Sequence, residues 1–200
     1  MFVSIRLLPV VGVLALFVAP RAIAQDDMVA NPFYKFWASS KVGATATHLE
    51  QTKLTGPESK AVPDGVDEKR ITYKLVENDK DRVVVEMVVT EQDFLGYVQA
   101  APTKYIYPAK LHKSHLERVY VDPPAGGKPG EETLKVDGKD LKVRTASGTV
   151  KSINDGEVIE YKLWLSDDVP GTIVKKVQTT KQKGDVIAET TTTLLSFKKD

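Results

Sequence analysis

Residues 157–198 read EVIEYKLWLSDDVPGTIVKKVQTTKQKGDVIAETTTTLLSFK. Apolar and polar side chains alternate over 157–165, the period of a strand that packs one face on a core. The segment 167–171 places Pro and Gly where a type II turn prefers them, and 183–185 supplies a second group of turn residues. The stretch therefore predicts three consecutive antiparallel strands, at 157–165, 172–181 and 186–198.

The preceding sequence repeats this theme. Asp137-Gly138 is a strong hairpin dipeptide because both of its turn positions tolerate positive φ. Asn78 to Asp81 supplies turn residues between two more alternating segments. Further strands are expected at 44–54, 69–77, 82–90, 103–108, 132–136 and 139–150, and 116–121 is a candidate for one more. The chain thus predicts a meander of about eight or nine strands.

One short helix is expected ahead of the strands. Asn31 is a suitable N-cap, and Pro32 loses nothing at the first helical position. Phe33, Phe36 and Trp37 are spaced three and four residues apart, which places three large aromatic rings on one helix face. Gly43 is expected to end the helix. That aromatic face needs a sheet on which to pack.

These elements together predict a mainly β fold. Twist accumulates over so many strands, and one apolar face has to be covered, so the sheet cannot stay flat. We expect a curled antiparallel meander, either a half-barrel or a closed barrel, packed on the short N-terminal helix. The interior of such a sheet is concave and apolar.

The first 24 residues have the pattern of a signal peptide. A charged start at Arg6 precedes an apolar run from Leu7 to Ala19, and Ala22-Ile23-Ala24 forms an Ala-x-Ala cleavage site. The run is shorter than the roughly 20 residues of a membrane-spanning helix, although an uncleaved anchor is the alternative. We expect a periplasmic or secreted protein whose single antiparallel β domain is 25–200, with no transmembrane span after cleavage.

Composition excludes several classes of function. Without residues 1–24, which hold two arginines and no acid, the 28 basic residues fall to 26 against 27 acidic ones, so no basic excess favours nucleic acid. There is no cysteine for a disulfide or a thiolate metal site. Neither a phosphate-binding glycine loop nor a Gly-x-Ser-x-Gly elbow is present. We expect no cofactor, and the absence of catalytic motifs favours a non-enzymatic role.

The candidate ligand-binding residues are aromatic. The face of the predicted helix would line the concave side of the sheet. Trp164 points away from Leu163 and Leu165, so it either lines a cavity or packs in the core as large aromatic residues commonly do. The predicted ligand-binding residues are Phe33, Phe36, Trp37 and Trp164.

A local basic segment is the second candidate site. The anion or partner patch comprises Lys110, His112, Lys113, His115 and Arg118. Residues three apart in an extended segment point to opposite faces, which argues against a metal site at the two histidines. His48 lies in a threonine-rich strand without a partner apparent in the sequence, and Asp167-Asp168 is interpreted as turn chemistry.

Two resemblances carry this interpretation further. An exported chain with an aromatic N-terminal helix and a long antiparallel meander resembles the periplasmic lipoprotein-carrier family, in which a curved sheet wraps helices around an apolar cavity. The segment Trp164 to Lys175 is similar to a strand, turn and strand of uncharacterised exported proteins from planctomycete-like bacteria. The first resemblance implies a carrier function, but this chain has one convincing helix where that family has several. The second implies no known chemistry.

The leading hypothesis is an exported binding or carrier module of the cell envelope for an apolar or amphiphilic ligand, such as a lipid. A protein-interaction or scaffold domain, using sheet edges or the basic patch to bind an envelope protein, is the second hypothesis. An enzyme with dispersed catalytic residues is the third. A cleft that joins His48 or His112 to a carboxylate would favour it.

Overall fold

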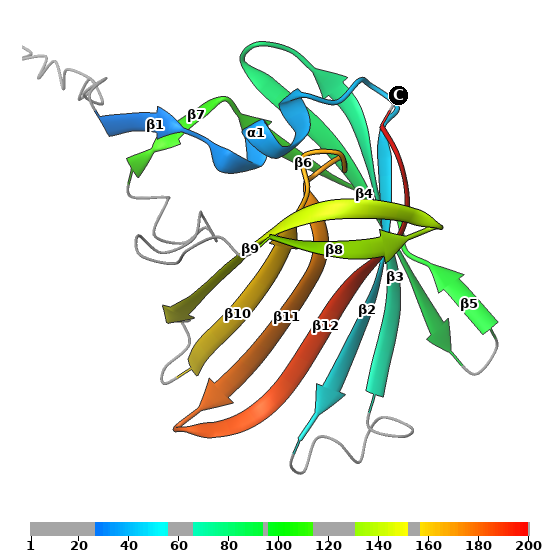
Figure 1. Cartoon of the computed structure of the whole chain (residues 1–200), viewed down its shortest axis with the longest axis vertical. Coiled ribbons are helices and arrows are strands. Elements are labelled where there is room, and N and C mark those ends of the chain that lie inside the picture. Colours follow the sequence, from blue (N-terminus) through cyan, green and yellow to red (C-terminus); the bar gives the residue numbers. More distant parts are fainter. Residues whose placement is uncertain (1–26, 56–65, 94–95, 114–130, 152–156, 200) are drawn as a thin grey trace, which may run out of the picture.

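A computed structural model describes residues 27–55, 66–93, 96–113, 131–151 and 157–199. The predicted signal peptide and the candidate strand at 116–121 lie outside these residues. Within them, β1 (Met28–Ala30) pairs with β7 (Lys110–His112), and all other strands form one antiparallel sheet. The predicted fold class is confirmed (Figure 1).

The main sheet consists of two meanders that meet at its centre. Its strand order is β5-β4-β3-β2-β12-β11-β10-β9-β8, with β6 pairing on β4 beside β5. The first meander contains β2 (Thr45–Leu54), β3 (Val66–Asn78), β4 (Arg82–Asp93), β5 (Gly96–Gln99) and β6 (Thr103–Pro108). The second contains β8 (Glu131–Val136), β9 (Lys139–Lys151), β10 (Glu157–Leu165), β11 (Ile173–Gln182) and β12 (Asp185–Lys198). The first and last long strands, β2 and β12, pair along their length.

The sheet curls but does not close. Its edges are β5 and β6 at one end and β8 at the other, so of the two expected forms the open one is observed. The hairpin of β8 and β9 lies across the front of the curled sheet, where β8 contacts β12 (Figure 1). Asp137 and Gly138 both have positive φ, 49° and 76°, as the hairpin prediction required.

The helix α1 (Pro32–Ala38) forms where the sequence predicts it. The Asn31 side chain caps it, and Pro32 occupies its first turn. The helix ends at Ala38, with Ser39 as its C-cap, several residues before the expected stop. Gly43, with φ of 96°, instead lies just before β2, and its N–H donates to the Leu75 carbonyl at 2.8 Å. The helix contacts β3, β4 and β6.

Two apolar clusters stabilise the sheet. One packs Trp37 of α1 on Leu75, Val83 and Val85 of β3 and β4. The other joins the β8–β9 hairpin to β10–β12 and β2, and its buried members are Ala46, Val136, Leu141, Val143, Trp164, Val169, Val174 and Leu194. Both clusters bury large side chains, each of which contributes about 1.5–3 kcal/mol.

Candidate functional site

The helix is attached to the sheet at both of its ends. Asn31 Oδ1 accepts the Phe33 N–H at 3.0 Å, while Asn31 Nδ2 donates to the Pro108 carbonyl at 2.8 Å. At the other end, Asn78 Nδ2 donates to the carbonyls of Ser40 at 2.8 Å and Ala38 at 3.2 Å. These bonds satisfy terminal backbone groups and fix the helix to β3 and β6.

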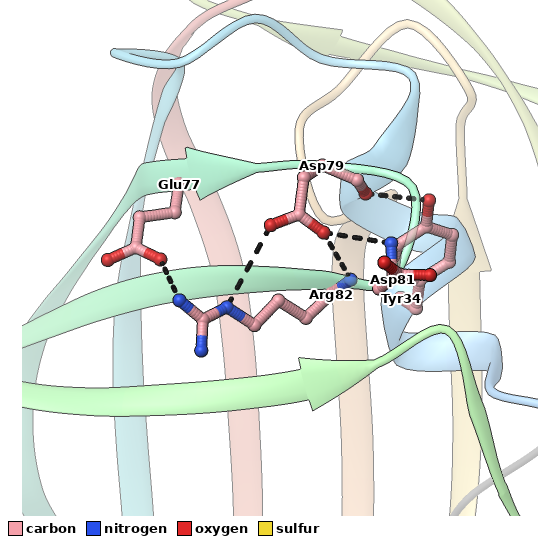
Figure 2. Close-up of polar contacts among 5 residues, drawn as sticks. All are labelled: Tyr34, Glu77, Asp79, Asp81 and Arg82. Carbon is pink, nitrogen blue, oxygen red and sulfur yellow. Dashed lines mark hydrogen bonds and ion pairs between the residues drawn. The ribbon is translucent and has the colours of Figure 1, made fainter.

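A third attachment joins the helix to the β3–β4 turn (Figure 2). The Tyr34 hydroxyl donates to the Asp79 carbonyl at 3.0 Å. Asp79 Oδ1 accepts the N–H groups of Asp81 and Arg82, each at 2.8 Å, and these bonds lower the pKa of the Asp79 carboxyl. Arg82 also forms an ion pair with Glu77 at 2.9 Å. The turn is therefore held by its own hydrogen bonds and contacts the middle of α1.

A pocket of about 150 Å³ lies between α1, the turn before β11 and one face of the sheet. Its lining combines aromatic rings with polar side chains. Its lining residues are Phe33, Phe36, Trp37, His48, Glu50, Tyr73, Tyr107, Pro170, Gly171, Ile173, Lys176 and Thr192. We call this the α1 pocket.

The aromatic side of the α1 pocket is an array of contacting rings. Phe33 stacks on Tyr107 with centroids 5.3 Å apart and meets Phe36 edge-on at 5.9 Å. Tyr107 in turn stacks on Tyr105 at 6.3 Å. Trp37 is buried, whereas Phe33 and Phe36 are half-buried. The half-buried pair therefore forms part of the pocket rim, and Trp37 lies deeper.

The turn between β10 and β11 closes another side of the pocket. The Gly171 N–H donates to the Phe36 carbonyl at 3.1 Å, so this turn is bonded directly to the helix. Gly171 has a φ of 74°, as the predicted turn requires. Thr172 also has a positive φ, 59°, which explains why β11 begins at Ile173, one residue later than predicted.

The polar side of the pocket comes from three adjacent strands. Glu50 of β2 lies directly opposite Thr192 of β12, which lies directly opposite Lys176 of β11. Residues directly opposite each other share a sheet face, so the three side chains form one row. Thr192 Oγ1 donates to Glu50 Oε2 at 3.3 Å. The row gives the pocket one anionic, one hydroxyl and one cationic group.

His48 is the most buried polar residue of the pocket, with only 4% of its surface exposed. Its Nε2 lies 2.9 Å from the Ile173 carbonyl oxygen. A carbonyl only accepts, so Nε2 carries the proton. Burial lowers the pKa of His48 below 6.5 and keeps the ring neutral, which leaves Nδ1 as an acceptor. Nδ1 is buried without a hydrogen-bond partner among the described residues.

Tyr73 lies beside His48 at the base of the pocket, with ring centroids 5.8 Å apart in an edge-to-face arrangement. Burial, followed by the negative charge of Glu50, raises the pKa of Tyr73 to about 12. The Tyr73 phenol is therefore neutral at physiological pH. It adds a large, mainly apolar surface next to the imidazole.

The arrangement is suited to holding a molecule by hydrogen bonds and ring contacts. His48 and Glu50 share the pocket, which is the juxtaposition of histidine and carboxylate that the enzyme hypothesis required. The described hydrogen bond of His48, however, goes to a backbone carbonyl and not to a nucleophile. The described residues hold no group of His, Asp and Glu side chains that fits a metal ion.

Three of the four predicted ligand-binding residues meet in the α1 pocket: Phe33, Phe36 and Trp37. The polar side was not predicted. The sequence places His48 and Glu50 two residues apart on one face of a strand, but it does not show that this strand pairs with β12. Lys176 and Thr192 lie next to Glu50 only because β12 pairs with β2 and β11 pairs with β12.

Trp164 lies elsewhere. Its neighbour Leu163 is directly opposite Lys176, which lines the pocket, so Trp164 points to the other face of the sheet. There it is buried in the cluster of the β8–β9 hairpin, and its Nε1 donates to Glu132 at 2.9 Å. The ammonium groups of Lys162 and Lys175 lie 4.4 and 5.1 Å from its ring centroid. Of the two readings of Trp164, the surroundings match core packing.

The basic patch is described only in part, because His115 and Arg118 lie outside the described residues. Lys110 and Lys113 are exposed. His112 is half-buried at the end of β7, with its Nε2 3.8 Å from Asp27 Oδ2. None of these three residues lines the α1 pocket.

A wider hollow of about 430 Å³ lies at the junction of β8, β9 and the end of β10. Its lining residues are Glu132, Thr133, Lys142, Val143, Arg144, Leu165, Ser166 and Asp167. Glu132 is already engaged by Trp164 and lies 3.8 Å from the Lys162 ammonium. Ligand sites are mostly apolar with a few convergent polar groups, which favours the α1 pocket over this charged hollow.

Within the part of the chain that the structure describes, the helix falls far short of the length and apolar character needed to cross a bilayer. A comparison with models of known protein families finds no match, and a comparison with curated proteins finds no similar sequence.

Proposed function

We propose that this chain is an exported, non-enzymatic binding module that holds a small apolar or amphiphilic molecule in the α1 pocket. The observation that carries the proposal is the pocket itself, whose lining combines aromatic rings of α1, β3 and β6 with a row of polar side chains. Such a pairing of apolar walls with a few polar groups is typical of small-molecule sites. The signal-peptide pattern of residues 1–24 supports a periplasmic or secreted location.

The pocket volume limits the size of the ligand. Drug-sized ligands occupy pockets of roughly 300–1,000 Å³, whereas a cavity of about 150 Å³ accommodates benzene. At about 150 Å³, the α1 pocket fits a molecule of one ring better than a lipid. The attachments of α1 at Asn31, Asn78 and Tyr34 favour a preformed pocket, which reduces the entropic cost of binding.

The two tryptophans of the chain allow a direct test. In an NMR titration with benzene, the indole N–H signal of Trp37 should shift, because this ring lines the pocket, while that of Trp164 stays in place. Movement of both signals, or of neither, would contradict the proposal. Native mass spectrometry of the purified protein would show whether a small molecule is retained.

A matched pair of variants makes the test sharper. Thr192→Leu fills the pocket, whereas Thr193→Leu places the same side chain at an exposed position of the same strand, on its opposite face. Benzene binding should be lost in Thr192→Leu and kept in Thr193→Leu. Equal binding by both variants would exclude the α1 pocket as the site.

A second candidate function is protein interaction through the edge formed by β5 and β6. Tyr97, Val98 and Ile106 on these strands are 68%, 53% and 60% exposed, an unusual group of apolar side chains at a sheet edge. Edge strands with apolar side chains favour strand addition by another chain. If this edge binds a protein, Ile106→Lys should abolish complex formation in size-exclusion chromatography with light scattering, while benzene binding is unchanged.

A further inference from the structure

The polar groups of the α1 pocket restrict the chemistry of its ligand. Three described buried side-chain atoms lack a hydrogen-bond partner, namely Ser40 Oγ, Thr172 Oγ1 and His48 Nδ1. Of these residues only His48 lines the pocket. A buried polar atom left without a partner costs about 1–3 kcal/mol, so each one calls for an explanation.

The role of Nδ1 follows from the other nitrogen of the ring. Nε2 donates to the Ile173 carbonyl, and a neutral imidazole carries only one N–H. Nδ1 therefore presents a lone pair and accepts a hydrogen bond. The bond to Ile173 also fixes the orientation of the ring, and His48 is one of the residues that line the pocket.

Two of the neighbouring features, Glu50 and the aromatic rings, favour the same class of ligand, whereas Lys176 does not. The Glu50 carboxylate is a second acceptor on the polar side, and it is satisfied in part by Thr192. The aromatic side consists of the rings of α1, Tyr73 and Tyr107, against which a flat ring packs well. Lys176 supplies the opposite chemistry, a donor, and so predicts a preference for ligand acceptors.

We propose that the α1 pocket selects small aromatic molecules that carry an O–H or N–H donor, and that His48 Nδ1 accepts the hydrogen bond from this donor. The inference rests on the proposed function, since it names the ligand class of the same pocket. It makes His48 a specificity-determining residue whose bond to Ile173 is structural and whose other nitrogen serves the ligand.

Three compounds of nearly equal size separate the alternatives. Phenol carries a donor, anisole carries only an acceptor, and toluene carries neither. In NMR titrations at pH 8, phenol should bind about tenfold more tightly than toluene or anisole, because only phenol donates a hydrogen bond to Nδ1 of His48. Phenol is the most strongly hydrated of the three, so apolar burial alone predicts the reverse order.

Two substitutions of His48 isolate its role. Gln places its amide near Nε2, so His48→Gln keeps a donor for the Ile173 carbonyl and removes the acceptor. Asn places its amide near Nδ1, so His48→Asn keeps an acceptor and loses the bond to Ile173. The preference for phenol should disappear in His48→Gln, while toluene binding remains. His48→Asn should retain part of the preference.

The outcomes distinguish the two proposals. If toluene binds wild-type protein as tightly as phenol, or if folded His48→Gln retains the preference, the donor inference is overturned while the proposed function stands. Equal binding of phenol and anisole, both above toluene, assigns the polar contact to Lys176 and also overturns it. If none of the three compounds binds, the proposed function fails and the inference fails with it. The wild-type comparison alone decides the matter if the variants do not fold.

Discussion

The indole of Trp37 lies directly against the backbone of Gly171, so closely that a Cβ added at Gly171 would be 2.8 Å from Trp37 Cζ2. This contact joins the helix to the turn before β11, and both residues line the α1 pocket. Gly171→Ala should therefore destabilise the protein by about 1–3 kcal/mol, from steric overlap and from the positive φ. Urea unfolding measures the change.

Gly184→Ala is the matched control for this substitution. Gly184 also has a positive φ, 95°, but its added Cβ would meet no atom within 4 Å. Gly184→Ala lowers the free energy of unfolding only through the positive φ. The additional loss in Gly171→Ala therefore measures the steric overlap with Trp37. Equal destabilisation would show that the contact contributes nothing.

His48 predicts a stability that depends on pH. Burial lowers its pKa in the folded protein, so the unfolded chain takes up a proton near pH 6.5 that the folded protein does not bind. The free energy of unfolding should be fully maintained above that pH and should fall as the pH drops below it. The glutamine of His48→Gln does not titrate. The free energy of unfolding of this variant, measured with urea, should therefore change less between pH 8 and pH 5 than that of wild type. Parallel profiles would be inconsistent with a neutral buried His48.

Trp164→Ala tests the position of this residue in the core. Because its ring is buried in the cluster of the β8–β9 hairpin, its removal should cost about 3–5 kcal/mol. Under conditions where the variant is folded, binding of phenol to the α1 pocket should be unchanged. Loss of binding without loss of stability would restore the alternative in which Trp164 contacts the ligand.

Tyr161 lies across Gly148, its direct partner on β9. A Cβ at Gly148 would lie 2.6 Å from Tyr161 Cζ, so Gly148→Ala should displace the ring and destabilise the sheet by about 1–3 kcal/mol. In the double variant with Tyr161→Ala, the cost of the added methyl should disappear. A double-mutant cycle with additive energies would contradict this coupling.

Asp79 predicts a local effect on the turn that supports α1. Asp79→Ala removes the acceptor for two N–H groups, so amide exchange at Asp81 and Arg82 should become faster. Asp79→Asn keeps a side-chain oxygen and should preserve most of the protection. As the pH is lowered, the contribution of the Asp79 carboxylate should be present above pH 3.8 and should be lost as it is protonated, because its pKa is lowered in the folded protein.

Most of the fold could be predicted from local patterns. The alternation in 157–165 and the turn residues Asp137-Gly138 act through neighbouring backbone, and the observed hairpins follow them. The Asn31-Pro32 cap likewise acts within a single turn. The short strands β1, β5 and β7 were missed because three or four residues carry too little periodicity to identify a strand.

Only the part of the site formed by residues close together in the sequence could be predicted. The aromatic spacing of Phe33, Phe36 and Trp37 reveals one wall of the pocket before any fold is known. The other wall depends on which strands pair, and His48 meets Ile173 across 125 residues of sequence. The local pattern of apolar and polar residues does not show which residues so far apart in the sequence come into contact. Trp164 was ambiguous for the same reason, since alternation fixes its face relative to Leu163 but not what covers it.

The pairing of β2 with β12 also determines when the binding site comes into existence during folding. Within the meander from β2 to β6 and the meander from β8 to β12, the paired strands are close in sequence, and such local pairings are expected to form faster than the pairing of β2 with β12. The pocket takes lining residues from both meanders, so neither half holds the complete site by itself. Ligand affinity therefore requires both halves of the chain, and we expect it to appear during refolding only when β2 and β12 have paired.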